Sequence, residues 1–127
     1  MKRILTAAVI WAAMLGTAQA QELVGSYVAY IGQADLYNSK GARLTEPWQI
    51  LRQDRANFHK FGKTQPGDEW DPFFSSISNR GKMERMIMNG SIEPAARNNL
   101  LKGGATVFVR IFGHGSTGTS VKVTVVR

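Results

Sequence analysis

The sequence contains no cysteine, only two histidines and only nine acidic residues in 127. Without cysteine, the chain forms no disulfide bond and carries no lipid-modified cysteine. Two histidines in separate segments give little support to a nucleophilic triad or a multi-histidine zinc site. The 13 glycines and 4 prolines follow no repeat, and 43% of the residues are hydrophobic, which excludes collagen-like, low-complexity and disordered chains. We therefore expect one small domain.

The first twenty residues resemble a bacterial export signal. Met1-Lys2-Arg3 is basic, Ile4 to Leu15 is an apolar run, and Ala18-Gln19-Ala20 places small residues where a signal peptidase reads them. The run has roughly 12 residues, fewer than the roughly 20 that span a bilayer, which favours cleavage before Gln21 over a retained anchor. No later stretch is long and apolar enough to span a membrane. We predict a cleaved signal peptide (1–20), a single domain (21–127) and a periplasmic or secreted location.

Positive charge dominates the predicted mature chain. The 16 lysines and arginines fall to 14 once Lys2 and Arg3 are removed, against 9 acidic residues, which leaves a net charge of +5. Such an excess attracts anionic partners over a long range. For an exported protein, we expect an anionic envelope polymer or an acidic protein as the partner, and nucleic acid is not expected.

Local patterns predict an α+β fold. The expected elements are a strand at 26–31, a small hairpin at 36–44, helices at 47–61, 80–88 and 94–102, and strands at 105–112 and 120–126 around a loop at 113–119. Pro47 and Pro94 fit the first turns of helices, and Gly103 fits a helix stop. Asp71 is expected to cap a short turn. The order predicts an antiparallel sheet, formed by the N-terminal strand and the C-terminal hairpin, packed against about three central helices.

Asp54 falls within the apolar arc of the helix predicted at 47–61. On a wheel of about 100° per residue, Ile50, Leu51 and Phe58 flank it. A buried carboxylate must be paired, hydrogen-bonded or protonated. We interpret Asp54 as a structural carboxylate that an arginine or backbone N–H groups hold. The alternative is a general acid or base with a raised pKa, which with His59 would form the centre of a small hydrolase or lyase.

A basic stripe follows another line of the same helix. The wheel places Trp48, Arg52, Arg55 and His59 within about 30 to 40° of one line along the helix. Guanidinium groups bind oxyanions bidentately, and an indole stacks on a sugar or a ring, so these four residues are our predicted binding site. The alternative is a solvated or structural face in which one arginine bonds the neighbours of Asp54 or the acidic loop that contains Asp71.

Three methionines have the spacing of a soft copper site. Met83, Met86 and Met88 could offer thioether ligands to cuprous ion, a chemistry that suits the bacterial periplasm. On a helix, however, Met88 points away from the other two, so we favour core filling. We predict no cofactor and no metal site, and the three methionines are only a weak candidate.

The C-terminal hairpin interleaves aromatic and cationic residues on one face, at Phe108, Arg110, Phe112 and Lys122. Such a face could stack single-stranded nucleic acid. Export argues against that partner, and we expect a helix to cover the phenylalanines.

Together these patterns favour a small exported, non-enzymatic binding or accessory domain that presents a basic face to an anionic envelope component or an acidic protein. The alternatives are the hydrolase or lyase at Asp54 and His59, and periplasmic copper handling by the methionines.

Overall fold

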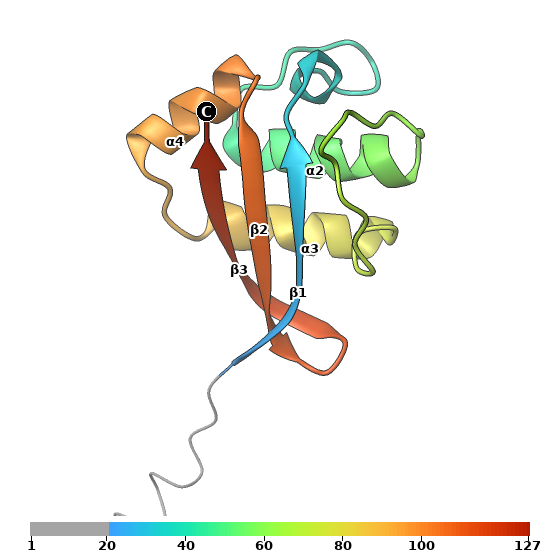
Figure 1. Ribbon diagram of the computed structural model, residues 1–127, viewed down its shortest axis with the longest axis vertical. Coiled ribbons are helices and arrows are strands. Elements are labelled where there is room, and N and C mark those ends of the chain that lie inside the picture. The colour runs from blue at the N-terminus through green and yellow to red at the C-terminus, as the bar shows by residue number, and fades with distance from the viewer. Residues whose placement is uncertain (1–20) are drawn as a thin grey trace, which may run out of the picture.

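The computed structural model describes residues 21–127 (Figure 1). The predicted signal peptide, residues 1–20, lies outside the described residues. The elements follow one another as β1 (Glu22–Tyr30), the short 3₁₀ helix η1 (Gln33–Leu36), α2 (Pro47–His59), α3 (Ile77–Met88), α4 (Pro94–Lys102), β2 (Thr106–His114) and β3 (Thr117–Val126). This order and the antiparallel sheet confirm the predicted α+β class.

The three strands form one sheet in the order β1-β2-β3, with β2 antiparallel to both neighbours. Along β2, Val107, Val109 and Ile111 are buried, as the alternation of apolar residues predicts. The hairpin of β2 and β3 is confirmed, but its turn is shorter than the predicted loop. His114 and Thr117 still pair across the two strands, so only Gly115 and Ser116 form the turn.

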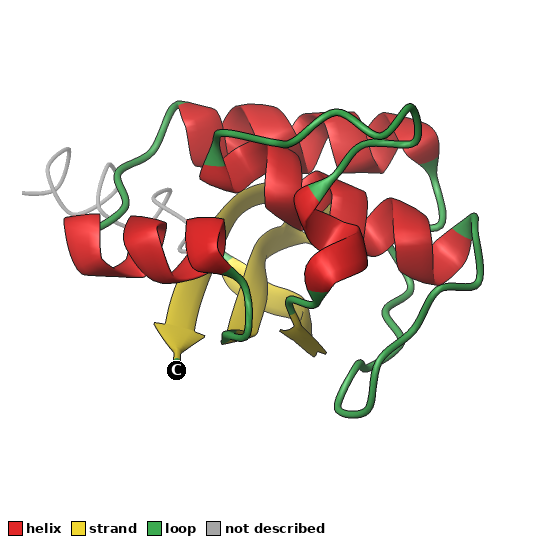
Figure 2. Cartoon of the chain, turned by 90° about the horizontal axis from the view of Figure 1, so that it is seen from above, coloured by secondary structure: helices red, strands yellow, loops and turns green. Residues whose placement is uncertain are grey.

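All three α-helices lie on the same side of the sheet, as the view from above shows (Figure 2). Pro47 and Pro94 begin α2 and α4, as predicted. α3 begins at Ile77, three residues before the predicted start, because Ser76 Oγ accepts a hydrogen bond from the Asn79 N–H at 3.2 Å. A serine cap of this kind satisfies a backbone donor that the first turn leaves free.

The core fills the space between the helices and this face of the sheet. Its buried side chains include Tyr27 of β1, Val109 of β2, Ile50 and Leu51 of α2 and Met83 of α3. Each of these residues is completely shielded from solvent. Burial of a side chain of this size contributes roughly 1.5 to 3 kcal/mol, so the sheet and the helices stabilise one another mainly through these contacts.

The predicted hairpin at 36–44 is present in its smallest form. Tyr37 and Arg43 form one bridge, the Leu44 N–H donates to the Leu36 carbonyl at 2.8 Å, and the Asn38 N–H donates to the Ala42 carbonyl at 2.9 Å. The side chain of Asn38 supports the turn. Its Oδ1 accepts hydrogen bonds from the N–H groups of Lys40 and Ala42, at 3.0 and 2.9 Å. An asparagine that binds the backbone of its own turn stabilises that turn and so holds the two short arms of the hairpin together.

Candidate functional site

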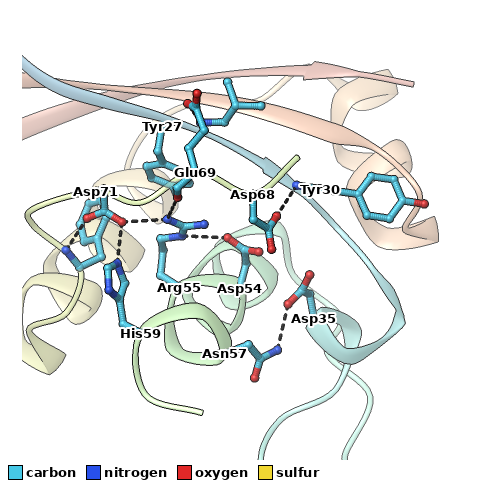
Figure 3. A network of polar contacts seen from close by, with 12 residues as sticks. Tyr27, Tyr30, Asp35, Asp54, Arg55, Asn57, His59, Asp68, Glu69 and Asp71 are labelled. Carbon is cyan, nitrogen blue, oxygen red and sulfur yellow. Dashed lines mark hydrogen bonds and ion pairs between the residues drawn. The ribbon is translucent and has the colours of Figure 1, made fainter. Parts of the chain in front are cut away.

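The side chain of Arg55, on α2, lies in the interior, where α2 faces β1 and the loop that follows α2 (Figure 3). Its Nε donates to Asp54 Oδ2 at 2.9 Å, and its Nη1 donates to Asp71 Oδ1 at 2.8 Å and to the Glu69 carbonyl at 2.9 Å. The guanidinium carbon lies 3.9 Å from the centre of the Tyr27 ring. Arg55 therefore joins three separate parts of the fold.

The prediction that Arg55 belongs to an exposed binding surface is wrong. Its side chain has 0% exposure and meets two buried carboxylates. The alternative, an arginine that bonds Asp54 and the acidic loop, describes the observed contacts. The buried arc of α2 is wider than the wheel suggests, because the loop carrying Asp71 encloses a side of the helix that the helix pattern alone leaves open.

Asp71 is the most heavily bonded side chain of this cluster. Its Oδ1 also contacts His59 Nε2 at 2.7 Å, and its Oδ2 accepts hydrogen bonds from the N–H groups of Phe73 and Phe74 at 2.8 and 2.6 Å. The predicted capping role of Asp71 is confirmed by these last two bonds. Burial alone would raise the pKa of Asp71, but the hydrogen bonds from His59 and Arg55 outweigh burial, and the pKa lies below its ordinary value.

Asp54 is buried, as predicted, and its environment differs from that of Asp71. Burial raises the pKa of Asp54 to about 8, against the opposing pull of Arg55. Its Oδ2 takes the one hydrogen bond from Arg55, and its Oδ1 has no partner among the described residues. One guanidinium thus lies between two carboxyl groups in a dry region. The environment of Asp71 favours its charged form, and that of Asp54 favours its protonated form.

This cluster does not have the geometry of an open catalytic centre. Asp54 is 1% exposed, and the side chain of His59 is 6% exposed and bonded to Asp71. Four surface hollows of about 90 to 590 Å³ are lined by other residues. A substrate has no hollow among these four through which it would reach either group, so the contacts support structural roles for both.

A second buried polar contact, between Asn57 and Asp35, is not predicted by the sequence patterns. Asn57 Nδ2 donates to Asp35 Oδ1 at 2.9 Å, which links α2 to η1 (Figure 3). Asp35 Oδ2 in turn accepts a hydrogen bond from the Gly32 N–H at 2.9 Å. The only sign of this contact in the sequence is the position of Asn57, one helical turn after Gln53 and on the side of α2 next to Asp54.

The remaining members of the predicted basic stripe do not form a single surface. Arg52 is partly exposed, and its Nη1 pairs with Glu84 Oε1 of α3 at 3.0 Å, which neutralises its charge. Trp48 is half-buried. Because Arg55 and His59 point inward, only Arg52 remains as a surface cation of this group. The prediction of one continuous binding stripe on α2 is therefore wrong.

The methionines divide between the core and the surface. Met83 is fully buried, and its sulfur accepts a hydrogen bond from the Tyr27 hydroxyl at 3.6 Å. Met88 is 46% exposed, and positions 83 and 88 lie about 140° apart around a helix. Met86 is half-buried. The three thioethers do not converge. The favoured interpretation, core filling, is confirmed for Met83 and wrong for Met88, which lies on the surface.

The other face of the sheet carries unneutralised positive charge. No helix of residues 21–127 covers it, so the expectation that a helix covers the phenylalanines is wrong (Figure 2). Arg110 and Lys122 lie opposite each other on β2 and β3. Their cross-strand neighbours share this surface, which we call the outer sheet face: Leu23, Ser26, Val28 and Tyr30 of β1, Thr106, Phe108 and Phe112 of β2, and Ser120, Thr124 and Val126 of β3.

The outer sheet face combines cations with aromatic rings. The Arg110 guanidinium lies 5.5 Å from the centre of the Phe108 ring, and Lys122 Nζ lies 6.0 Å from that of Phe112. Among residues 21–127, neither cation forms an ion pair with a carboxylate. The alternation of Phe108, Arg110 and Phe112 was visible in the sequence, but the fact that this face is open was not.

No helix in the described part of the chain is long and apolar enough to cross a membrane. The same residues contain no group of three or more His, Asp or Glu side chains placed to hold a metal ion. Comparisons with protein-family models, with curated proteins and with solved structures found no match.

Proposed function

We propose that this chain is a small exported binding or accessory domain, not an enzyme, and that its outer sheet face binds an anionic partner. One observation carries the proposal. Arg110 and Lys122 lie side by side at the centre of an uncovered face that has aromatic rings and no carboxylate. The proposal moves the predicted basic face from α2 to the sheet, because the arginines of α2 are buried or paired.

The chemistry of this face suits carboxylate, sulfate or phosphate groups. Arg110 offers a planar fork of N–H donors, and Lys122 adds a compact charge beside it. Aromatic rings next to the cations give a flat apolar surface on which the remainder of the partner can rest. The excess of positive charge over the whole chain speeds the approach of an anionic partner.

The proposal predicts a loss of affinity when both cations are removed. The Arg110→Gln/Lys122→Gln variant should bind polyglutamate and dextran sulfate roughly 2- to 30-fold more weakly, since two ion pairs are lost and each exposed ion pair is worth about 0.2 to 1 kcal/mol. Wild-type binding should weaken as salt rises from about 0.05 to 0.3 M. Fluorescence anisotropy with labelled polymers measures both effects.

A variant of equal charge provides the control. Lys40 and Lys63 are exposed and lie in loops outside the sheet. Lys40→Gln/Lys63→Gln should therefore keep most of the affinity. Equal losses in the two double variants would show that only net charge matters, and the outer sheet face would lose its assigned role.

Export is tested separately. The chain recovered from an exported fraction should begin at Gln21 when its intact mass is measured, because Ala18 and Ala20 fit the signal-peptidase site. An exported chain that retains Met1 would contradict the cleaved signal peptide.

A further inference from the structure

The chain closes one edge of its sheet. At the free edge of β1, the Val28 N–H donates to Glu69 Oε1 and the Tyr30 N–H donates to Asp68 Oδ1, both at 2.8 Å. The Glu69 N–H returns a hydrogen bond to the Val28 carbonyl at 2.8 Å. Figure 3 shows Asp68 beside Tyr30 at this edge. Because an exposed strand edge is a template for another strand, these bonds keep β1 from pairing further.

The opposite edge is open among residues 21–127. β3 is ten residues long and pairs only with β2. No loop of the described chain forms a main-chain hydrogen bond with it. Its sequence contains no proline, no acidic residue and one lysine, Lys122. The residues that commonly keep an edge strand from pairing with another strand are therefore nearly absent from β3.

A hollow of about 590 Å³ lies beside this open edge. The end of α3, the segment that joins α3 to α4, the start of α4, β3 and Arg110 of β2 form its walls. Its lining combines apolar side chains with one carboxylate and two cations. The apolar residues are Met86, Ile87, Ile92, Ala96, Val121, Val123 and Val125, and the charged ones are Glu93, Arg110 and Lys122. Every second side chain of a strand added to β3 would point towards the helices, where this hollow offers apolar space.

The alternate side chains of an added strand would lie on the outer sheet face. There they would meet Lys122 on the adjacent strand, with Arg110 one strand further. Acidic side chains are complementary to these two cations. A second copy of β3 would instead bring another lysine and no carboxylate, so charge favours an acidic segment over self-pairing.

We propose that the open edge of β3 receives an extended segment of an acidic protein, in which apolar and acidic residues alternate, as a fourth strand of the sheet. Main-chain hydrogen bonds give such strand addition its affinity, and alternate side chains give it specificity. The inference rests on the proposed function, since it uses the same cations, and it identifies the partner as a polypeptide and not a glycan.

Two isomeric peptides test strand addition directly. The parent probe is a labelled peptide of ten residues, the length of β3, in which valine and glutamate alternate. One derivative is N-methylated at every valine, and the other at every glutamate. In a strand the N–H groups of alternate residues point to opposite edges, so each derivative is blocked at one edge only.

Strand addition should separate the two isomers in fluorescence anisotropy. One should bind at least about tenfold more weakly than the parent because several main-chain hydrogen bonds are lost, while the other keeps its affinity. A peptide that alternates valine with lysine should not bind. Equal behaviour of the two N-methylated isomers would overturn the inference. Light scattering confirms that the peptides remain unassociated.

A chain variant tests the hollow. Ile92→Asp places a carboxylate among the apolar residues of the hollow, and Ile77→Asp makes the same change at the exposed start of α3. The first should weaken binding of the parent peptide at least about tenfold at a temperature where the variant is folded, and the second should not. If Ile92→Asp is unstable, binding of the two isomeric peptides to the wild-type chain still tests strand addition.

The two proposals fail in different ways. Binding of polyglutamate and dextran sulfate without binding of the alternating peptide overturns strand addition and leaves the proposed function intact. Absence of binding to all three probes overturns both. Self-association through β3 that the peptide cannot displace, seen by analytical ultracentrifugation, would show that a second copy is the occupant and would overturn the choice of an acidic partner.

Discussion

Replacing Arg55 with methionine should lower the free energy of unfolding by about 3 to 5 kcal/mol, the loss expected when one partner of a buried ion pair is removed. Asp71 would keep its charge in the interior and lose its guanidinium donor. Methionine retains much of the length of the side chain and its contact with the Tyr27 ring. The loss of stability would therefore come mainly from the unpaired charge of Asp71 and less from a cavity.

Arg52→Met is the matched control for this prediction. It makes the same substitution on the same helix, where the arginine is partly exposed and paired with Glu84. Surface ion pairs contribute about 0 to 1 kcal/mol, so this variant should remain close to the wild type. Urea unfolding followed by tryptophan fluorescence gives both values. Similar losses at the two positions would contradict the interior role of Arg55.

Raising the pH from about 5 to about 8 should destabilise the fold by up to about 1.4 kcal/mol per pH unit through Asp54. Burial raises the pKa of this carboxyl to about 8 in the folded chain, whereas an unfolded aspartate titrates near about 3.9. Between these values the folded chain holds a proton that the unfolded chain has released. The stabilisation is complete below about pH 4 and is lost as the pH rises through about 8.

Asp54→Asn isolates this contribution. The amide resembles the protonated carboxyl in shape and charge, so the variant should retain most of its stability at pH 5 and lose the steep decline towards pH 8. Asp35, whose pKa burial also raises, stays in place in both proteins. Melting temperatures measured by circular dichroism at successive pH values make the comparison. A wild-type profile that does not fall over this range would show that Asp54 is charged.

Local patterns predicted most of the architecture because the relevant interactions are close in sequence. The alternation around Val109 determines which face of β2 is buried, and it does so without knowledge of the partner strand. Pro47 and Pro94 mark helix starts because they lack an N–H that the first turn does not need. Asp71 was predictable as a cap for the same reason, since its acceptors serve the N–H groups two and three residues later.

The burial of Arg55 and the openness of the sheet were not predicted because both depend on contacts between distant segments. A helical wheel gives the direction of Arg55 but not the position of the loop that carries Asp71, 16 residues later. The closure of β1 by Glu69 spans 41 residues, and no local pattern signals it. The openness of the outer sheet face likewise depends on all helices packing on one side, which the alternation of Phe108 and Arg110 does not specify.

The most direct test of the central claim is a titration of the ¹⁵N-labelled mature chain with polyglutamate, followed by amide chemical shifts. The outer sheet face should respond, with the largest changes at Phe108, Arg110 and Lys122 and their neighbours on β2 and β3. The exposed side of α2 around Arg52 should change little. Shifts concentrated on α2, with β2 and β3 unaffected, would contradict the assignment of binding to the outer sheet face.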